Sequence, residues 1–412
     1  MKILNSNPVP ATSTTCRLPF RRGIPAGILC LLLAAQPAGA KIWRVNNTAG
    51  VAHDYVAIAD AVAAAGRGDT IHIEGSVTPY NESVTVDKKL YLFGPGYDLT
   101  VNPETQHIKY SAKVSHITFA AGSDSSVLAG VEQIEHTAQL TLTKTAGSTS
   151  AGININFPGP TGGSAAWGGA TLNIAASNIK VVNCKLNYVK IDNSGSTLKN
   201  IDIRKCWFCP GVVLSAANTN AVENLNLINN FFRNDHATSV YRVIDLHAVV
   251  KANIGNNTFY GGFKVHAPEN CRITNNVFYL IHGRAVDKLT NSVSNEYRGN
   301  IANMDQLGGM VNGQNGNTIR TSETNEEGST VWFSATGGIA MVDKYFIANN
   351  TASSPVRQAA VFAGTTGELG MFGGLAPFVL SGLTNIPSVY EIIMPAEVSS
   401  DGFEVTVKVK AH

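Results

Sequence analysis

The sequence predicts an all-β fold: a right-handed parallel β-helix, in which a single strand of chain winds into a solenoid with a short N-terminal capping helix. Three observations predict it. Five segments repeat one pattern at a spacing of about two dozen residues, apolar residues alternate within each segment, and pairs of asparagines follow the alternation in three of them. Repetition at this period is typical of chains whose successive turns stack on one another.

The repeated segment is eight residues long and begins at residues 179, 201, 225, 252 and 271. Its first and third positions are apolar and alternate with mostly polar residues, which is the period of a strand with one buried face. Its eighth position is Leu or Phe, and we expect these side chains to form a stack in the core. Leucine-rich repeats are a competing interpretation, but their signature is absent from the chain.

The fifth and sixth positions of the repeat predict a sharp bend. They are occupied by Asn229-Asn230, Asn256-Asn257 and Asn275-Asn276. Asparagine tolerates the left-handed backbone that such a bend needs, and stacked carboxamides can hydrogen-bond to one another. Cys184 and Cys206 occupy the sixth position and Cys271 the first, so we interpret these cysteines as packing residues and not as catalytic thiols.

The region before the repeats has its own pattern. Residues 42–45 read as a strand, and an apolar stripe over residues 55–65 predicts a short helix that closes the end of the stack. Residues 70–73, 84–86 and 90–93 predict three further strands, separated by turn residues.

The domain organisation follows from these patterns. We expect the β-helix to span residues 41–365, although the alignment of residues 306–344 with the repeat stays open. Residues 366–412 are expected to form a C-terminal loop and a capping strand. The alternating residues 403–409 predict that strand, which we expect to cover the C-terminal edge of the stack.

The first forty residues differ from the rest of the chain. Their basic residues are followed by an apolar stretch at 27–35, and Ala38-Gly39-Ala40 supplies a cleavage pattern. This order is typical of a secretory signal peptide, so we expect residues 1–40 to be removed and the protein to be exported, either secreted or held at the cell surface or in the periplasm. No apolar run approaches the roughly 18 residues of a membrane span, so no transmembrane segment is expected.

Composition excludes some partners. The whole chain has 31 basic and 29 acidic residues, and the expected leader carries basic residues and no acidic ones. A nearly neutral protein is not expected to bind nucleic acid. Cys206 and Cys209 have the C-x-x-C spacing, but no second pair accompanies them, so we predict no metal site.

Four short stretches near the start suggest a family. They are residues 68–71, 80–82, 84–86 and 90–96, which read GDTI, YNE, VTV and LYLFGPG. They resemble the opening of secreted bacterial proteins of the pectin-lyase-like right-handed β-helix superfamily, and the resemblance extends over residues 42 to about 305. It implies a β-helix and contact with extracellular polysaccharide, mostly uronate-containing. Where such a protein is a lyase, the resemblance implies a base with Ca²⁺ or Arg as the cation.

The catalytic motifs of that superfamily are not found in this chain. The paired aspartates of polygalacturonases are missing, and the sequence His282-Gly283-Arg284 matches only a fragment of their pattern. The superfamily also contains adhesins and non-catalytic proteins. The resemblance therefore implies a polysaccharide partner and leaves catalysis open.

A cluster of ionisable residues is the best candidate for a site. His247 precedes Asn256 by nine residues and His266 precedes Asn275 by nine, while Asp245 and Lys264 lie two residues earlier in each segment. Counting from the bend therefore places His247 beside His266 and Asp245 beside Lys264 on one outer face. Such a group could supply a base, an acid and cations. The alternative is a solvated face with an ordinary cross-strand ion pair.

Three further residues are expected to border this cluster and to bind substrate, because they are near it in sequence. They are Arg242, His282 and Arg284. The four tryptophans are interpreted mainly as packing residues.

Two functions stay open at this point. One is a secreted protein that binds, and as a lyase or glycoside hydrolase also cleaves, uronate-containing polysaccharide. The other is a non-catalytic surface or adhesion scaffold. A convergent group of ionisable residues favours the first, and a smooth exterior favours the second.

Overall fold

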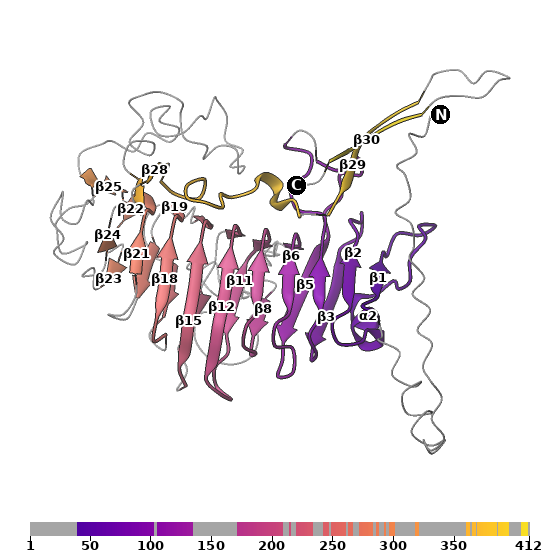
Figure 1. Ribbon diagram of the computed structural model, residues 1–412, viewed down its shortest axis with the longest axis horizontal. Helices are drawn as coiled ribbons and strands as arrows, with labels where there is room; N and C mark the ends of the chain where they lie inside the picture. The colour runs from indigo at the N-terminus through magenta and orange to yellow at the C-terminus, as the bar shows by residue number, and fades with distance from the viewer. Residues whose placement is uncertain are drawn as a thin grey trace, which may run out of the picture.

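The computed structural model (Figure 1) is an elongated stack of strands. It describes residues 39–102, 105–134, 171–208, 214–215, 220–233, 242–246, 249–260, 263–266, 272–282, 286–287, 292–293, 296–300, 318–320, 360–362, 365–367, 369–384, 386–394 and 405–410. The expected signal peptide, apart from Gly39 and Ala40, and residues 306–317 and 321–344 lie outside the described residues.

Most strands belong to two parallel sheets. The first has ten strands, in the order β1 (Ile42–Val45), β2 (Thr70–Ile73), β4 (Tyr91–Phe93), β6 (Val127–Ala129), β9 (Lys180–Val182), β12 (Leu198–Arg204), β15 (Val222–Ile228), β18 (Ala252–Gly255), β21 (Arg272–Thr274) and β24 (Ser292–Val293). Each strand pairs with the one that precedes it in this order, so the sheet grows in one direction along the chain.

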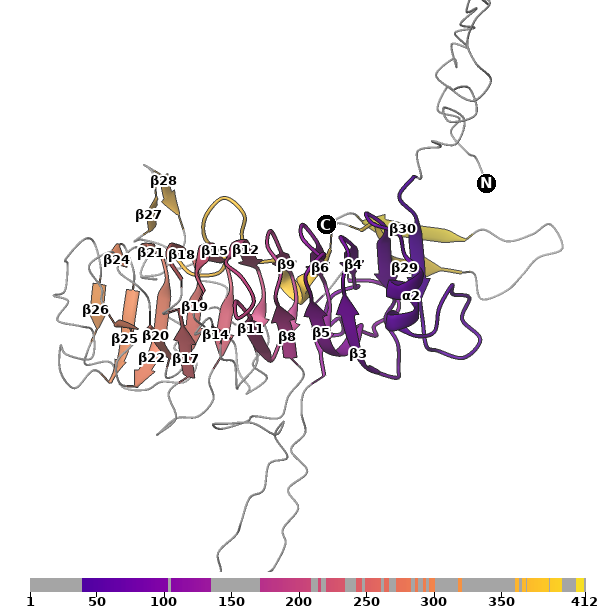
Figure 2. The ribbon, with the colours of Figure 1, turned by 90° about the horizontal axis from the view of Figure 1, so that it is seen from below.

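The second sheet has sixteen strands in two series that meet at β5 (Lys113–Phe119). One series contains β3 (Tyr80–Val86), β5, β8 (Thr171–Ile174), β11 (Tyr188–Ile191), β14 (Leu214–Ser215), β17 (Arg242–Asp245), β20 (Phe263–His266) and β23 (Val286–Asp287). The other contains β7 (Glu132–Gln133), β10 (Lys185–Leu186), β13 (Trp207–Phe208), β16 (Phe231–Arg233), β19 (Thr258–Tyr260), β22 (Val277–His282), β25 (Glu296–Asn300) and β26 (Thr318–Arg320). Figure 2 shows the first series from below.

The predicted fold class, a closed all-β right-handed β-helix, is wrong. The described strands form two open parallel sheets, accompanied by helix α2 (Ile58–Ala64) and by two antiparallel pairs, and no closed solenoid is found among them. Parallel sheets with a helix at one end fit an α/β-type fold rather than an all-β helix. The repeat indicates that equivalent residues stack, but it carries no information on whether the sheets close around an axis.

The stacking of the repeat itself is confirmed. In one row, Ile201 pairs with Leu225, which pairs with Ala252. In the next row of apolar residues, successive strands pair in the order Ile203, Leu227, Ile254 and Ile273. These side chains are buried, while the residues between them are only partly covered. Alternation by two therefore sends one face of each strand to the core, as the sequence predicts.

Asparagines form the predicted bend. Asn183, Asn229, Asn256 and Asn275 all have φ between 54° and 56°, the left-handed region that asparagine tolerates. The next column contains Asn230, Asn257 and Asn276, which are buried and joined by hydrogen bonds from carboxamide to carboxamide of 3.1 and 3.0 Å. Each repeat is thus tied to the next along the stack by side chains as well as by strands.

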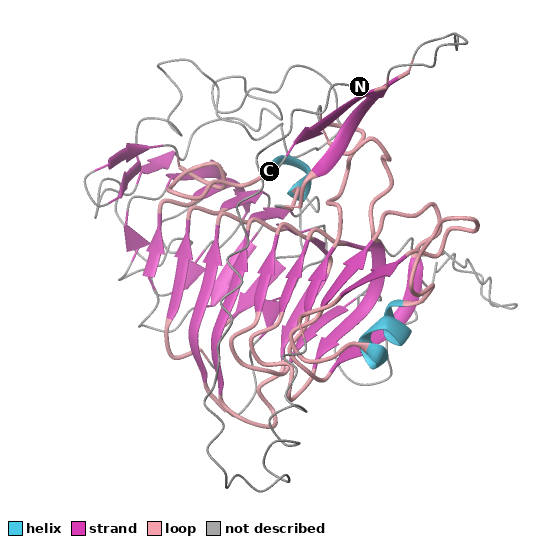
Figure 3. Ribbon diagram, turned by 45° about the vertical axis from the view of Figure 1, so that its right-hand side comes forward, coloured by secondary structure: helices cyan, strands magenta, loops and turns pink. Residues whose placement is uncertain are grey.

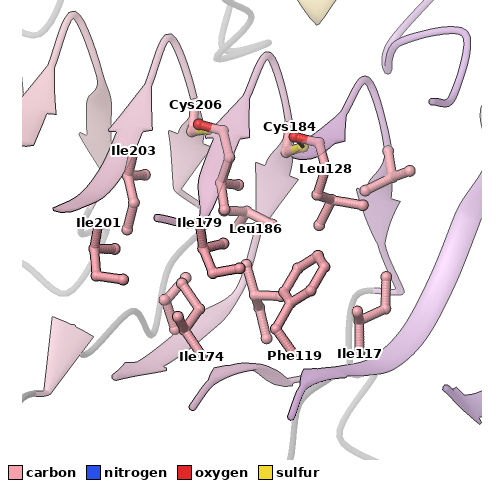
Figure 4. Close-up of a cluster of buried hydrophobic side chains, with 14 of the residues drawn as sticks. Ile117, Phe119, Leu128, Ile174, Ile179, Cys184, Leu186, Ile201, Ile203 and Cys206 are labelled. Atoms are coloured by element: carbon pink, nitrogen blue, oxygen red, sulfur yellow. Dashed lines mark hydrogen bonds between the residues drawn. The ribbon is translucent and has the colours of Figure 1, made fainter. Parts of the chain in front are cut away.

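The core contains the expected apolar columns. The rings of Phe208, Phe232 and Phe259 stack with centroids 4.5 and 4.8 Å apart. Each buried ring stabilises the fold by roughly 1.5–3 kcal/mol relative to exposure. Cys184 and Cys206 are free and buried beside the aliphatic side chains of this core (Figure 4), which confirms their interpretation as packing residues.

The N-terminal strands and helix form as predicted. Helix α2 buries Ile58, Ala61 and Val62 in the core and lies at the end of the stack beside β1 (Figure 3). The Glu82 carboxylate accepts hydrogen bonds from the backbone N–H groups of Ile58 and Ala59 at 2.7 and 2.9 Å. Those donors have no partner within the helix, so an acidic side chain from β3 determines where the helix begins.

A returning segment crosses the bends of the ten-stranded sheet. Residues 369–384, here called the strap, run back from the C-terminal repeats to the N-terminal end (Figure 1). The N–H of Gly370 donates to the carbonyl of Asn275, and the Asn229 carboxamide donates to the carbonyls of Met371 and Gly373. Asn183 then donates to the carbonyl of Leu383 at 2.8 Å.

One glycine of the strap is required for this path. Gly382, in the 3₁₀ turn η4 (Leu380–Gly382), has φ +55°, and an added Cβ would lie 2.3 Å from the carbonyl oxygen of Asn183. The strap therefore approaches the bend too closely for any side chain at this position.

The last strand was expected to cover the C-terminal edge of the stack. It lies elsewhere. β30 (Thr406–Lys410) pairs antiparallel with β29 (Ser388–Ile393), and the N–H of His107 donates to the carbonyl of Val389. This hairpin lies at the N-terminal end, because the strap carries the chain back along the stack before the last strand begins. A second antiparallel pair joins β27 (Ala360–Phe362) to β28 (Thr365–Gly367).

Within the described residues, no helix is long and apolar enough to cross a membrane.

Candidate functional site

The structure brings together two of the four predicted catalytic residues, in a different pairing. Asp245 on β17 is the register partner of His266 on β20, whereas Lys264 is the partner of Val243. The predicted pair of Asp245 with Lys264 is therefore wrong. His247 lies outside the described residues. The position beside His266, where His247 was predicted, is occupied by Asp245.

The error has a simple cause. The prediction assumed that every repeat has the same number of residues between this sheet and the bend. Asp245 is followed by eleven steps to Asn256, but its partner His266 is followed by only nine steps to Asn275. Two additional residues in one connection shift the register by two, which keeps the face and changes the neighbours.

The expected substrate-binding residues are not gathered around this pair. Arg242, on β17 three residues before Asp245, pairs with Phe263 on β20. His282 lies on β22 and pairs with Asn300, in the other series of the sixteen-stranded sheet. Arg284 lies outside the described residues. Proximity in sequence was a poor guide here, because a repeat crosses both sheets within two dozen residues.

The register instead reveals a continuous line of polar residues across eight neighbouring strands, here called the polar row. Its members are Thr85, Thr118, Asn173, Lys190, Ser215, Asp245, His266 and Asp287, each the register partner of the next. With neighbouring strands about 4.8 Å apart, the row extends for roughly 34 Å. Sequence reasoning found only two of its members.

The members of the row whose side chains are described lie on the outer face of the sheet. Thr85 is exposed, Thr118, Asn173 and Lys190 are partly covered, and the residues that alternate with them, such as Ile117 and Leu172, are buried. A row of hydroxyl, amide and charged groups on a regular surface can donate and accept several hydrogen bonds to one extended ligand.

Lys190 supplies a cation near the middle of the row. Its Nζ lies 2.9 Å from Oδ2 of Asp192, and its side chain is 42% exposed. A hydrogen bond from Ser194 lowers the pKa of Asp192, and Lys190 lowers it further. Partial burial acts in the opposite direction but does not outweigh them. Beside them, burial raises the pKa of Tyr188, which stays a neutral hydroxyl donor at neutral pH.

Three titratable residues end the row. Asp245 and Asp287 are both register partners of His266, on the strands to either side. Two strand spacings separate the Cα atoms of the aspartates by roughly 10 Å, with the histidine between them. The register therefore makes these three residues neighbours along the backbone.

A metal site is not apparent in the part of the chain that the structure describes. No group of three or more His, Cys, Asp or Glu side chains there is arranged to hold an ion. Trp207 is buried against Phe231, with ring centroids 4.1 Å apart, and Trp43 donates to Asp69 at 2.9 Å. Both tryptophans pack within the protein; Trp167 and Trp332 lie outside the described residues.

Comparison with known proteins adds no assignment. No protein-family model matches the chain, no curated protein is similar to it in sequence, and no solved structure matches it. The resemblance to pectin-lyase-like proteins therefore stays a prediction from short motifs.

Proposed function

We propose that this protein is exported and binds extracellular polysaccharide along the polar row. The observation that supports the proposal is the register of eight consecutive strands, which aligns Thr85 through Asp287 in one line. A polysaccharide is an extended, repeating ligand with many hydroxyl groups, and a straight row of evenly spaced polar groups complements such a ligand. The expected signal peptide is consistent with an extracellular partner.

The charge of the row does not by itself select a uronate-containing polymer. Lys190 favours an anionic sugar, but Asp245 and Asp287 at the other end repel one. The preference for uronate thus rests on the resemblance alone. Neutral and acidic polymers should both be tested, each with and without Ca²⁺, because a calcium ion would bridge carboxylates of the protein and of the sugar.

Cleavage would occur at the end of the row. There, the register brings the backbones of Asp245, His266 and Asp287 onto three neighbouring strands, and carboxyl and imidazole groups are the residue types that act as acid and base in hydrolysis. The second candidate function, a non-catalytic surface scaffold, uses the same row for binding alone. The absence of the superfamily's catalytic motifs favours this second candidate.

The experiment compares binding and product formation by the purified chain. Pectate, alginate and a neutral glucan are titrated by calorimetry, while reducing ends report hydrolysis and ultraviolet absorbance reports the double bonds that a lyase leaves. Lys190→Ala should weaken binding, whereas Lys180→Ala, which removes an exposed lysine from the other sheet, should leave it unchanged. Binding without product would establish the scaffold function. No binding to any polymer, or equal effects of both substitutions, would refute the proposal.

A further inference from the structure

The C-terminal hairpin forms one wall of a groove at the N-terminal end of the stack, here called the hairpin groove. One part of the groove, ≈ 330 Å³, is lined by Ile108 and Pro95 on one side and by Val389, Ile392 and Val407 on the other. A second part, ≈ 380 Å³, also has mostly apolar walls, which include Val51 and Tyr110, and it contains the polar side chains of Arg44, Asn46, Thr48 and Glu74. His72, Pro95, Gln106 and Ile108 line both parts, so the two are continuous.

The hairpin is amphipathic and presents its apolar face to this groove. Register pairs Ile392 with Val407 and Val389 with Val409 on one face, and Glu391 with Lys408 on the other. The Glu391–Lys408 ion pair is 2.6 Å long, and neither residue lines the groove. Val407 and Val409 nonetheless stay 51% and 56% exposed. The apolar face is therefore turned toward the sheet without being covered by it.

An isolated two-stranded hairpin is at best marginally stable in water. Here a backbone hydrogen bond from His107 to Val389 links the hairpin to the loop that precedes β5. An aliphatic group placed between Val407 and Ile108 would remove apolar surface from water on both walls, which stabilises the hairpin and the ligand together. Sites of a few hundred Å³ with mostly apolar walls are typical of small-molecule binding.

The polar side chains of the second part determine which head group fits there. The Arg44 guanidinium lies 2.6 Å from the Glu74 carboxylate, and the Asn46 carboxamide donates to the same carboxylate at 2.8 Å. An anionic head would have to compete with Glu74 for Arg44, and a cationic head with Arg44 for Glu74. Hydroxyl groups can bond to the edges of this ion pair without displacing either charge.

We propose that the hairpin groove binds a small amphiphile, with its aliphatic body between β29–β30 and Ile108 and an uncharged, hydroxyl-bearing head toward Asn46 and the Arg44–Glu74 pair. This site is separate from the polar row and does not depend on the function proposed for it. Octyl β-glucoside below its micellar concentration serves as the neutral probe, and octanoate and octylammonium serve as probes with the same body and a charged head.

The test uses calorimetric titration of the full chain and two matched variants. Val407→Asp places a charge in the apolar wall, while Thr406→Asp places the same charge one residue away on the opposite face of the hairpin. Octyl β-glucoside should bind saturably at one site, more tightly than either charged probe. Val407→Asp should weaken that binding by about tenfold or more, and Thr406→Asp by less than about twofold. Ile392→Asp repeats the test from the facing strand, and thermal unfolding confirms that all variants fold.

Three results would overturn the proposal. Binding of octyl β-glucoside that does not saturate would show that the probe partitions onto apolar surface and does not occupy a single site. Tighter binding of octanoate or octylammonium would refute the uncharged head. Equal weakening by Val407→Asp and Thr406→Asp would place the ligand outside the groove.

Discussion

Asn257 accepts two hydrogen bonds from Asn230, one from its backbone N–H at 2.9 Å and one from its carboxamide at 3.1 Å. Its own carboxamide donates to the carbonyl of Leu227 and to Asn276. All of these groups are buried, so a single side chain joins three successive repeats. This relationship explains why the repeats carry asparagine where an apolar residue of the same size would also fit.

Replacing this side chain should be costly. Asn257→Leu keeps the volume but leaves buried donors and an acceptor without partners, so we expect a loss of about 3 kcal/mol or more in the free energy of unfolding. Asn253→Leu, on the partly covered face of β18 in the same repeat, should change it by less than about 0.5 kcal/mol. Denaturant unfolding measures both, and similar losses would contradict a special role for the asparagine column.

The strap should loosen when a donor beneath it is removed. Asn229→Asp retains tolerance of the left-handed backbone but replaces the donor to Met371 and Gly373 with a carboxylate that faces two carbonyl oxygens. We expect peptides covering residues 369–378 to exchange amide hydrogens faster, equivalent to about 2 kcal/mol or more of lost protection. Asn224→Asp, at an exposed position with the same sign of φ, is the matched control and should leave the exchange of the strap unchanged.

His72 should make stability depend on pH. Its burial, with Glu74 and Arg44 as opposing neighbours, lowers the pKa of His72 below the ordinary 6.5. The unfolded chain therefore takes up this proton at a higher pH than the folded chain does. Stability should be complete above pH 6.5 and decline as pH falls from 6.5 toward the lower folded value.

The His72 contribution can be isolated by substitution. Unfolding free energies of the wild type and of His72→Gln are compared at several pH values, with the exposed His53→Gln as control. His72→Gln should reduce the decline below pH 6.5, and His53→Gln should not. An unchanged pH profile in His72→Gln would show that the neutral imidazole is not coupled to folding.

The buried cysteines should resist modification. Burial, with hydrogen bonding to Cys184, raises the pKa of the Cys206 thiol, so almost no reactive thiolate forms near neutral pH. We expect peptide mapping after alkylation to find Cys184 and Cys206 unmodified in the native protein and both modified in denaturant. Rapid native labelling of either would contradict their place in the core.

Local patterns predicted local structure well in this chain. The alternation in residues 42–45 and 70–73 matches β1 and β2, and the apolar stripe of residues 55–65 contains α2. The asparagine bends also form where expected. Each of these features depends on side chains within a few residues of one another or on one repeat period, and that information is present in the sequence.

The candidate site was predicted only in part, because it depends on exact register. Asp245 and His266 were recognised, but the count from the bend missed a difference of two residues and therefore missed Ser215 and Asp287 as their neighbours. Comparing the outward positions of successive strands, rather than counting from the bend, would have found Thr118, Asn173 and Lys190 in the same row.

By itself, the sequence determined that apolar and asparagine columns two dozen residues apart would stack, because each repeat has one face that only another repeat can cover. Only the tertiary structure decided that the stack consists of two open parallel sheets, which strand residues share a row, and that the strap returns the last hairpin to the N-terminal end. Those outcomes depend on the length of each connection and on hydrogen bonds between residues as distant as Asn183 and Leu383, and no repeating pattern encodes either.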